Sequence, residues 1–506
     1  MKNQQLAILM VTLLVIQVFP NYGFLANSYA QTEPDVYIGI DLSYGEVEEA
    51  KALIDQVSSY TNLIVIGTTK ITFFPNKLTE VFQYAYNKGL SFISLTPTFP
   101  DIRIESIPSK NEWFEYANEA WGDRLLGFYY LDEPGGRQLD GAQSWVGGNM
   151  SSSVSSYAEA ADQFTNAIGN NIDRTRTYTL NSSGYPLFTS DYALYWFDYK
   201  AGYDTIFAEL GWNYSRQLNV ALCRGAATAH NKDWGAIVTW TYTSPPYIES
   251  GEELYNDLIL AYDNGAKYIV VFDGNEGWTQ GILKPEHLDA LQRFWDYVQS
   301  NPRKSNPVSD RTAYVLPNAY GFGFRGPQDH IWGLWEADAL SYNISVSVSS
   351  LLDEYGETLD IIYNDGLQSG NTYGYNQLIY WDSYSPPPPE ISILSPENKT
   401  YAISNVSLTF TLNKPVTWMG YSLDAEEQVP VTENITLYNL SNGPHNITVY
   451  AKDKFESMGI SETIHFNIAE PPEPFQTALI VAVSVASAAV VAAGLVVCFR
   501  KRKGRK

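Results

Sequence analysis

The chain has 506 residues, 45% of them hydrophobic, and a formal net charge of −24 at pH 7. A surface this acidic repels phosphate backbones, so the composition argues against nucleic acid as a partner. The two cysteines, Cys223 and Cys498, lie in separate segments and cannot pair. We therefore expect a fold stabilised by a buried core and not by a disulfide.

Residues 1–30 have the layout of a cleavable secretory signal. A positive charge at Lys2 is followed by an apolar run over residues 6–18 and by the small-residue site Ser28-Tyr29-Ala30. The run is shorter than a hydrocarbon core of about 30 Å requires, so we expect cleavage after Ala30 and not a retained signal anchor.

Residues 31–305 alternate short β-branched or aromatic runs with longer segments of helical period, which predicts eight β/α units. The predicted strands cover residues 36–41, 63–67, 91–96, 125–132, 177–180, 205–210, 236–241 and 268–273. Helical patterns follow nearly every strand, for example at 45–59, 78–87, 152–168 and 252–263. The fifth unit is the least regular, because 185–200 is compatible with a helix, a loop or an extra strand.

Eight such units in this length predict an α/β fold, a (β/α)8 TIM barrel. A doubly wound open sheet is the alternative. Its nucleotide-binding variants lack support, because no Gly-x-Gly-x-x-Gly or P-loop motif follows an early strand.

Residues 311–384 predict a small α/β domain, with strands at 313–316, 359–363 and 377–381 and a helix at 346–355. Its place after the barrel resembles that of the Rossmann-like domain of some β-galactosidases, by order along the chain alone.

A proline-rich linker at 385–390 precedes short alternating strands over 391–470, which predict a β-sandwich. The runs Ile-Ser-Ile-Leu-Ser-Pro from Ile391, Gly-Tyr-Ser-Leu-Asp from Gly420 and His-Asn-Ile-Thr-Val-Tyr-Ala from His445 resemble the immunoglobulin-like modules of prokaryotic surface proteins. The resemblance implies a stalk.

Residues 477–499 form an uncharged stretch of 23 residues, long enough for one transmembrane helix. The basic tail at 500–506 is expected to stay cytoplasmic, which leaves the N-terminus outside. The predicted location is therefore the cell membrane, single-pass, with the bulk of the chain extracellular.

The active site of a (β/α)8 barrel lies at the carboxyl ends of its strands. Acidic residues gather there in this sequence: Asp41 ends the first strand, Asp132 and Glu133 the fourth, Glu209 the sixth and Asp273 the eighth. Aromatic residues accompany them: Tyr129, Tyr130, Trp212, Trp240, Tyr242 and Trp278. Carboxylates beside aromatic rings suit a sugar site, because acids protonate the glycosidic oxygen and flat rings cover the apolar faces of a pyranose.

The segment 127–134 reads Gly-Phe-Tyr-Tyr-Leu-Asp-Glu-Pro, a buried strand that runs into two acids and a proline. It resembles the large clan A of glycoside hydrolases, in which the fourth strand ends in Asn-Glu-Pro. The resemblance implies that Glu133 is the general acid/base. Two departures stand against it: Asp132 replaces the asparagine, and the seventh strand has no glutamate where the clan keeps its nucleophile. Glu209 is the nearest substitute.

The residues themselves leave two readings open. A working pair combines Glu133 as the acid with Glu209 or Asp132 as nucleophile or base. Alternatively, Asp-Glu-Pro is a helix cap in an exposed turn, and Asp41 and Asp273 orient loops through backbone amides.

The five histidines fall in separate segments without ligand spacing, so neither a metal nor a cofactor is predicted. The first hypothesis is a membrane-anchored extracellular glycoside hydrolase-like enzyme acting on a polysaccharide or glycan. The alternatives are a non-catalytic carbohydrate-binding or adhesive surface protein and a purely structural envelope protein.

Overall fold

The computed structural model describes residues 34–141, 154–365, 372–453, 456–469, 490–493 and 495–496. Contacts divide the chain into two compact units, Met1–Tyr384 and Ser385–Lys506. The predicted signal at 1–30 and tail at 500–506 lie outside the described residues, as does most of the predicted span at 477–499. Within the described residues, no helix has both the length and the apolar character that crossing a membrane requires.

Eight parallel strands close into a barrel in chain order, which confirms the predicted (β/α)8 architecture. The strands are β1 (Tyr37–Leu42), β2 (Leu63–Ile66), β3 (Ser91–Leu95), β4 (Leu125–Tyr129), β5 (Leu187–Asp191), β6 (Thr205–Leu210), β7 (Asp233–Val238) and β8 (Tyr268–Phe272). Asp41 lies opposite Val65 of β2 on one side and Phe272 of β8 on the other, so β1 completes the ring. The closure excludes an open sheet.

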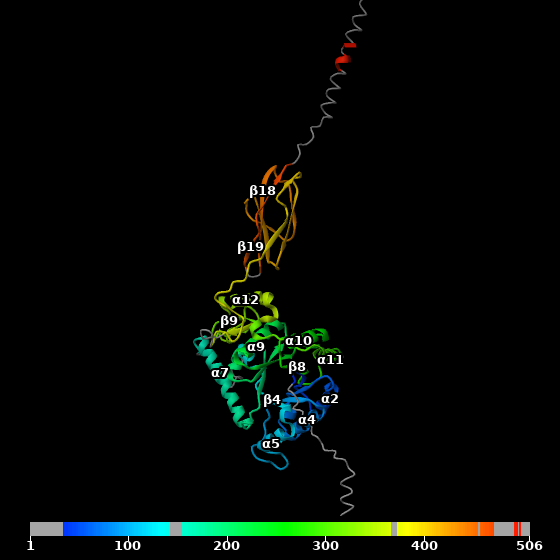
Figure 1. Ribbon diagram of the computed structural model, residues 1–506, viewed down its shortest axis with the longest axis vertical. Coiled ribbons are helices and arrows are strands. Elements are labelled where there is room, and N and C mark those ends of the chain that lie inside the picture. Colours follow the sequence, from blue (N-terminus) through cyan, green and yellow to red (C-terminus); the bar gives the residue numbers. More distant parts are fainter. Residues whose placement is uncertain are drawn as a thin grey trace, which may run out of the picture. The chain divides into compact units, whose positions relative to one another are not determined.

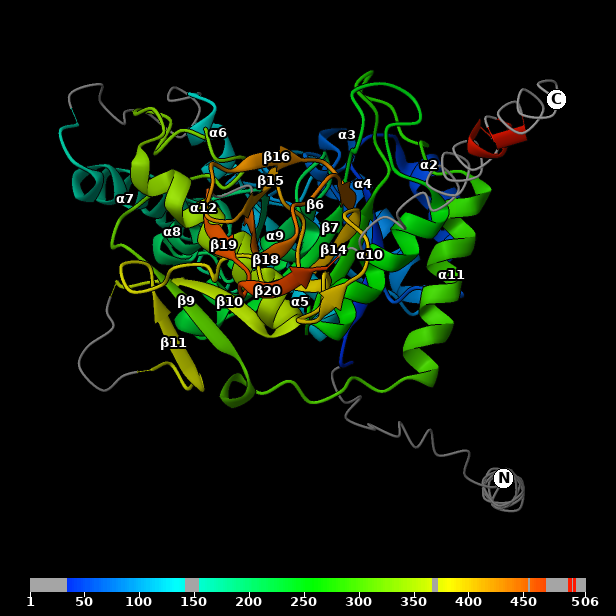
Figure 2. The ribbon, with the colours of Figure 1, turned by 90° about the horizontal axis from the view of Figure 1, so that it is seen from above.

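Helices surround this ring (Figure 1). They are α2 (Val47–Val57), α3 (Thr69–Thr72), α4 (Pro75–Asn87), α5 (Lys110–Trp121), α6 (Pro134–Leu139), α7 (Tyr157–Arg174), α8 (Tyr195–Ala201), α9 (Arg216–His230), α10 (Gly251–Asp263) and α11 (Pro285–Ser300). Figure 2 shows α10 and α11 side by side. Ser250 and Glu253 form a capping box that begins α10.

Two apolar cores result from the alternation of side chains along the strands. The interior of the barrel is filled at one end by stacked rings, among them Tyr37 and Tyr268 with ring centroids 5.2 Å apart. A larger core lies between strands and helices and includes Phe82, Trp113 and Phe164. Side chains thus fill the interior of the barrel, so a binding site is expected at the ends of the strands.

The predicted fifth strand at 177–180 is wrong. Helix α7 continues into a wider helical turn at Thr175–Thr179, and β5 is Leu187–Asp191, inside the segment that the sequence left open. The β-branched threonines suggested a strand, but Ile168 and Ile172 extend the buried face of α7 to this point. The correction moves the end of β5 to Ser190 and Asp191.

A three-stranded parallel sheet in the order β10-β9-β11 belongs to the same compact unit. Its elements are β9 (Thr312–Leu316), α12 (Ala339–Tyr355), β10 (Leu359–Tyr363) and β11 (Gln377–Tyr380). The fully buried carboxylate of Asp360 accepts bonds of 2.7 Å from both Arg224 of α9 and Arg311. A Cβ at Gly225 would lie 2.4 Å from the carbonyl oxygen of Ile361, so only glycine lets α9 approach β10 this closely.

The second unit is a β-sandwich. Its strands are β12 (Ile391–Ser395), β13 (Thr400–Tyr401), β14 (Val406–Leu412), β15 (Trp418–Leu423), β16 (Val429–Val431), β17 (Ile435–Leu437), β18 (Gly443–Lys452), β19 (Met458–Ile460) and β20 (Ile464–Ile468). One sheet has the order β12-β14-β17 and the other β13-β20-β18-β15-β16. Alternate residues of β14, such as Val406 and Leu408, share one core with Ile447 and Val449 of β18. The predicted alternating strands are confirmed.

Candidate active site

Acidic side chains converge on the carboxyl end of the barrel. They are Asp41 of β1, Asp132 and Glu133 after β4, Asp191 of β5, Glu209 of β6 and Asp273 after β8. The carboxylates act on one another electrostatically: Asp132 and Asp273 on Asp41, and Asp132 and Asp191 on Glu133. The closed barrel therefore brings all four predicted strand ends together and adds β5, which the sequence did not place there.

The loop after β4 holds Glu133 in a left-handed conformation, with φ 51° and ψ 50°. Such backbone is strained for a residue with a side chain and persists where its surroundings hold it. Two contacts do so here. The amide of Glu133 donates to the carbonyl of Ser190 at 3.1 Å, and the Asp191 carboxylate accepts from the amides of Gly135 at 2.6 Å and Gly136 at 2.8 Å. Strand β5 thus fixes the direction of Glu133.

Glu133 and Glu209 face each other, and their side chains form a hydrogen bond. Glu209 is 5% exposed. Burial, followed by the carboxylates of Asp132 and Asp191, raises the pKa of Glu133 to about 8. Burial and the neighbouring Glu133 also hold the pKa of Glu209 well above its usual range. Two carboxyls at hydrogen-bonding distance cannot both ionise, so the pair keeps at least one proton near neutral pH.

Two hydroxyl groups connect Glu209 with Asp132. The Ser190 hydroxyl lies 2.6 Å from Glu209 Oε1 and 2.9 Å from the Tyr129 hydroxyl. Tyr129 in turn donates to Asp132 Oδ1 at 2.6 Å. The buried glutamate is thereby joined to an aspartate whose side chain is 49% exposed.

Arg137 of α6 is the cation that pairs with these acids. Its Nη2 lies 3.1 Å from Asp132 Oδ2, and its Nε lies 3.6 Å from Glu133 Oε2. The closer contact is the one to Asp132, so Arg137 forms its main ion pair with Asp132 and a longer one with Glu133.

The carboxyl groups of Asp41 and Asp273 differ in their hydrogen-bond partners. Asp273 accepts from the Gln280 side chain at 2.9 Å and from the Leu283 amide at 2.8 Å, so it orients the loop after β8. Asp41 accepts from the Ser43 hydroxyl through one oxygen, and its buried Oδ1 has no partner among the described residues. Burial raises the pKa of Asp41 to about 7. Asp41 therefore leaves one buried acceptor unsatisfied at this end of the barrel.

The predicted aromatic residues divide into three groups. Trp212 and Trp240 lie edge to face, with ring centroids 6.3 Å apart, and the Trp240 indole donates to the Gly274 carbonyl. Trp278 and Tyr242 are exposed at the rim, 73% and 46% respectively. Tyr130 instead packs against the core between strands and helices, while the preceding Tyr129 packs against the interior of the barrel.

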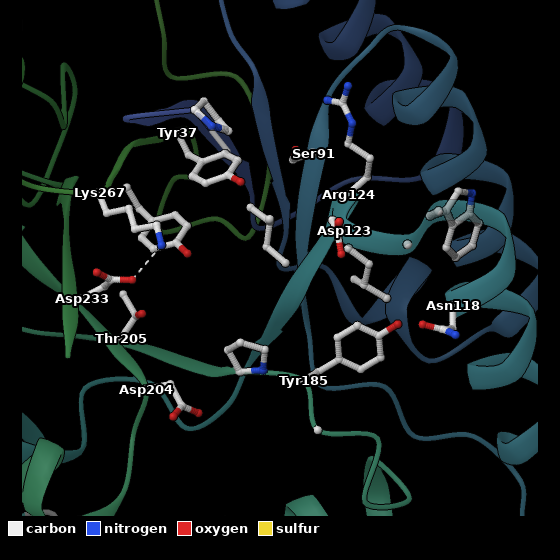
Figure 3. Close-up of a pocket in the computed structure, with 18 of the residues that line it drawn as sticks. Tyr37, Ser91, Asn118, Asp123, Arg124, Tyr185, Asp204, Thr205, Asp233 and Lys267 are labelled. Atoms are coloured by element: carbon white, nitrogen blue, oxygen red, sulfur yellow. Dashed lines mark hydrogen bonds and ion pairs between the residues drawn. The ribbon is translucent and has the colours of Figure 1, made fainter. Parts of the chain in front are cut away.

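A hollow of about 1700 Å³ lies at the opposite, amino end of the barrel. Figure 3 shows Lys267 paired with Asp233 on one side of it and Arg124 on the other. Lys232 pairs with Asp204 and Lys267 with Asp233 there, which is typical of the scaffold end of this fold. We place the site at the cluster of acids at the carboxyl end and not at this hollow. In the described part of the chain, no three His, Cys, Asp or Glu residues are arranged to hold a metal ion.

Sequence reasoning named Tyr129 only as an aromatic neighbour of the acids, and it missed Arg137, Ser190 and Asp191. The signal for the last two was present: Leu-Phe-Thr-Ser-Asp at Leu187–Asp191 is a short β-prone run that ends in an acid, like the other strands. Gly184 and Pro186 bound it, but the threonine-rich run upstream is more typical of a strand by composition.

No family model and no curated protein matches the chain. Solved structures that match include the α-L-fucosidase isoenzyme 2 of Paenibacillus thiaminolyticus, at 8% identity over 83% of this chain and 74% of that one, with a TM-score of 0.40. The β-glucuronidase of Parabacteroides merdae matches at 7% identity over 86% of this chain, with a TM-score of 0.26, and the chain spans 49% of its length.

A third match is the thiamine phosphate pyrophosphorylase of Pyrococcus furiosus, at 11% identity over 53% of this chain and 96% of that one, with a TM-score of 0.29. Glycoside hydrolases are thus among the structural neighbours, but scores this low carry no argument about activity. The case for a function rests on the residues at the strand ends.

Proposed function

We propose that the barrel is a glycoside hydrolase-like head that acts on a polysaccharide or glycan, with Glu133 as the general acid and Glu209 as its partner carboxylate. The observation that carries the proposal is the hydrogen-bonded Glu133–Glu209 pair at the carboxyl end of the barrel, with both pKa values raised. A carboxyl that keeps its proton near neutral pH can deliver it to a leaving oxygen.

The surroundings suit the charge that develops during glycosidic cleavage. The transition state resembles an oxocarbenium ion, which nearby carboxylates stabilise. Asp41, Asp132 and Asp191 supply that negative environment, and the cation near them, Arg137, is already paired with Asp132. Because Glu133 and Glu209 are hydrogen-bonded to each other, a sugar that enters between them has to separate the two carboxyls.

The rim offers surfaces for the sugar itself. The exposed ring of Trp278 contacts Tyr44 edge-on at 5.5 Å, which leaves a face for a pyranose. Beside the rim, Asp41 adds a buried carboxyl whose Oδ1 has no partner among the described residues. We assign substrate binding to these residues together with Trp212, Trp240 and Tyr242.

A non-catalytic carbohydrate-binding protein is the second candidate. Strand β7 ends at Val238, and Thr239, Trp240, Thr241 and Tyr242 follow without an acid. A barrel that kept its aromatic rim and lost one carboxylate would bind and not cut.

We further propose that the head is extracellular and tethered. The layout of residues 1–30, the uncharged stretch at 477–499 and the basic tail support export and a single anchor. In this arrangement the sandwich is an immunoglobulin-like stalk, and 311–384 is a Rossmann-like support of the barrel. Protease treatment of intact cells tests it: removal of the head without lysis is expected, and protection of the head contradicts export.

Assays on the first compact unit, residues 31–384, test the enzyme. The unit is incubated with a panel of polysaccharides beside its Glu133→Gln variant and a control, Glu119→Gln, which alters an exposed acid of α5. We expect reducing ends from the parent and the control, and a loss of about 10²- to 10⁴-fold in Glu133→Gln. Equal rates in all three rule out the role of Glu133, and binding without turnover supports the second candidate.

A further inference from the structure

We propose that Tyr129 and Ser190 form a proton relay that connects the buried carboxyl of Glu209 with Asp132 at the solvent side of the site. The inference rests on the proposed function, because it names the route by which the Glu133–Glu209 pair gains and loses its proton. Tyr129 lies in the segment 127–134 and Ser190 belongs to no motif in the sequence, so the two hydroxyls come together only through the pairing of β4 with β5.

The chain of contacts is continuous. Asp132 Oδ1 lies 2.6 Å from the Tyr129 hydroxyl, which lies 2.9 Å from the Ser190 hydroxyl, which lies 2.6 Å from Glu209 Oε1. Exposure falls along it, from an Asp132 side chain that is 49% exposed to Ser190 and Glu209 at 3% and 5%. The relay therefore begins at a solvent-exposed carboxylate, Asp132, and ends at a buried carboxyl, Glu209.

Counting protons assigns a charge state to the ends. Each hydroxyl carries one proton, so Tyr129 and Ser190 supply protons to two of the three contacts. Two oxygen atoms 2.9 Å apart without a proton between them repel, so the third proton comes from a carboxyl. Asp132 forms an ion pair with Arg137, whereas Glu209 is buried among acids, so the proton resides on Glu209.

The same three protons also allow a second state, in which Asp132 is protonated and Glu209 is ionised. The carboxyl of Glu209 passes its proton to Ser190, Ser190 passes its own to Tyr129, and Tyr129 passes its own to Asp132. Three O–H bonds break and three form, and the negative charge moves from Asp132 to Glu209 with no other reactant. In this state Glu209 is the carboxylate that the proposed chemistry requires.

Other titratable groups surround the buried end and have to be held constant in a test. Those that face Glu209 are Glu133, Asp132 and Asp191 together with the phenols of Tyr129, Tyr195 and Tyr214. Glu133 offers the proton a second route, because it is hydrogen-bonded to Glu209 and its side chain is 27% exposed. The experiment therefore uses the Glu133→Gln background.

The first test is an infrared pH titration of the carboxyl C=O stretch of Glu209 in the full chain, with the band identified by its loss in Glu209→Gln. Tyr129→Phe removes the acceptor of the Ser190 proton, so Ser190 turns to Glu209 and stabilises its carboxylate. We expect the midpoint of Glu209 to fall by about one pH unit. Tyr203→Phe is the matched control, because this buried phenol bonds to the Tyr130 carbonyl and to neither carboxyl.

An unchanged midpoint in Tyr129→Phe overturns the relay, since it means that Ser190 already donates to an ionised Glu209. A second pair keeps the test decisive if Tyr129→Phe does not fold. Ser190→Ala breaks the chain and Ser190→Thr retains the hydroxyl, so deuterium exchange into the Glu209 carboxyl is expected to slow about tenfold or more only in the alanine variant. Equal exchange rates overturn the proposal. Neither readout needs a substrate, so a parent without hydrolytic activity removes the proposed function and leaves these outcomes intact.

Discussion

Acidic side chains have different surroundings at the two ends of the barrel. At the amino end, Asp204 pairs with Arg176 at 2.6 Å and with Lys232 at 2.8 Å. At the carboxyl end, Glu133 and Glu209 meet each other and further acids. The acid described at the amino end thus has two cations of its own, whereas several acids at the carboxyl end share the single cation Arg137.

The pKa values record this difference. Burial alone raises the pKa of Asp204, but Lys232 and Arg176 bring it below its usual range. Burial and neighbouring acids raise the pKa of Glu133 to about 8. Paired acids support the scaffold, whereas a cluster of unpaired acids destabilises the fold and is typical of a functional site.

The largest effect is expected for Glu209→Gln, which removes an unpaired buried acid. Activity on the polysaccharide identified in the panel is expected to fall by about 10²- to 10⁴-fold, because the partner carboxylate of Glu133 is lost. The free energy of unfolding in urea is expected not to fall, since the amide needs no proton to be buried. A protein that loses stability and keeps its activity would show that Glu209 belongs to the scaffold.

The pH dependence of stability sharpens the comparison. Folded Glu133 holds its proton up to about pH 8, compared with about 4.5 as an ordinary glutamate, so the native state binds more protons in this window. The free energy of unfolding therefore declines as pH rises through it, by at most about 1.4 kcal/mol per pH unit for one proton. Urea unfolding of Glu133→Gln between pH 5 and 8 is expected to decline less than the parent, and parallel curves contradict the raised pKa.

The mirror experiment at the amino end is Asp204→Asn, in which two cations lose their partner. A loss of about 1 kcal/mol is expected in urea unfolding at pH 7, because the pair is partly exposed. The folded-state pKa is depressed, so this contribution is present above the unfolded value and disappears as pH falls. Activity is expected to stay at the parent level, and a variant that is stable but inactive would reverse the roles of the two ends.

The smallest effect is expected at the rim, for Trp278→Ala. The ring is 73% exposed, so stability changes by less than about 0.5 kcal/mol, while affinity for the sugar falls by about 1 kcal/mol through the lost stacking face. Calorimetric titration measures the affinity. Tyr178→Ala, at a comparably exposed tyrosine after α7, is the control, and equal losses in both exclude a specific platform.

Strand positions could be predicted where an apolar run is bounded by turn residues. Residues 63–66 and 205–210 are such runs, and β2 and β6 occupy them. The fifth strand could not, because Thr175–Thr179 has the composition of a strand and lies at the end of a long amphipathic helix. The buried face of α7 decides the conformation there, and burial is a property of the folded chain.

The repeat of β/α units and the acids at the ends of β4 and β6 could be predicted from local sequence patterns. That Ser190 and Asp191 join these acids follows only from the folded barrel. The reason is physical: the position of β5 against β4 is set by barrel closure, which brings residues about 60 positions apart into contact, as Tyr129 and Ser190 show. The cluster of acids and hydroxyls at the site follows from those contacts.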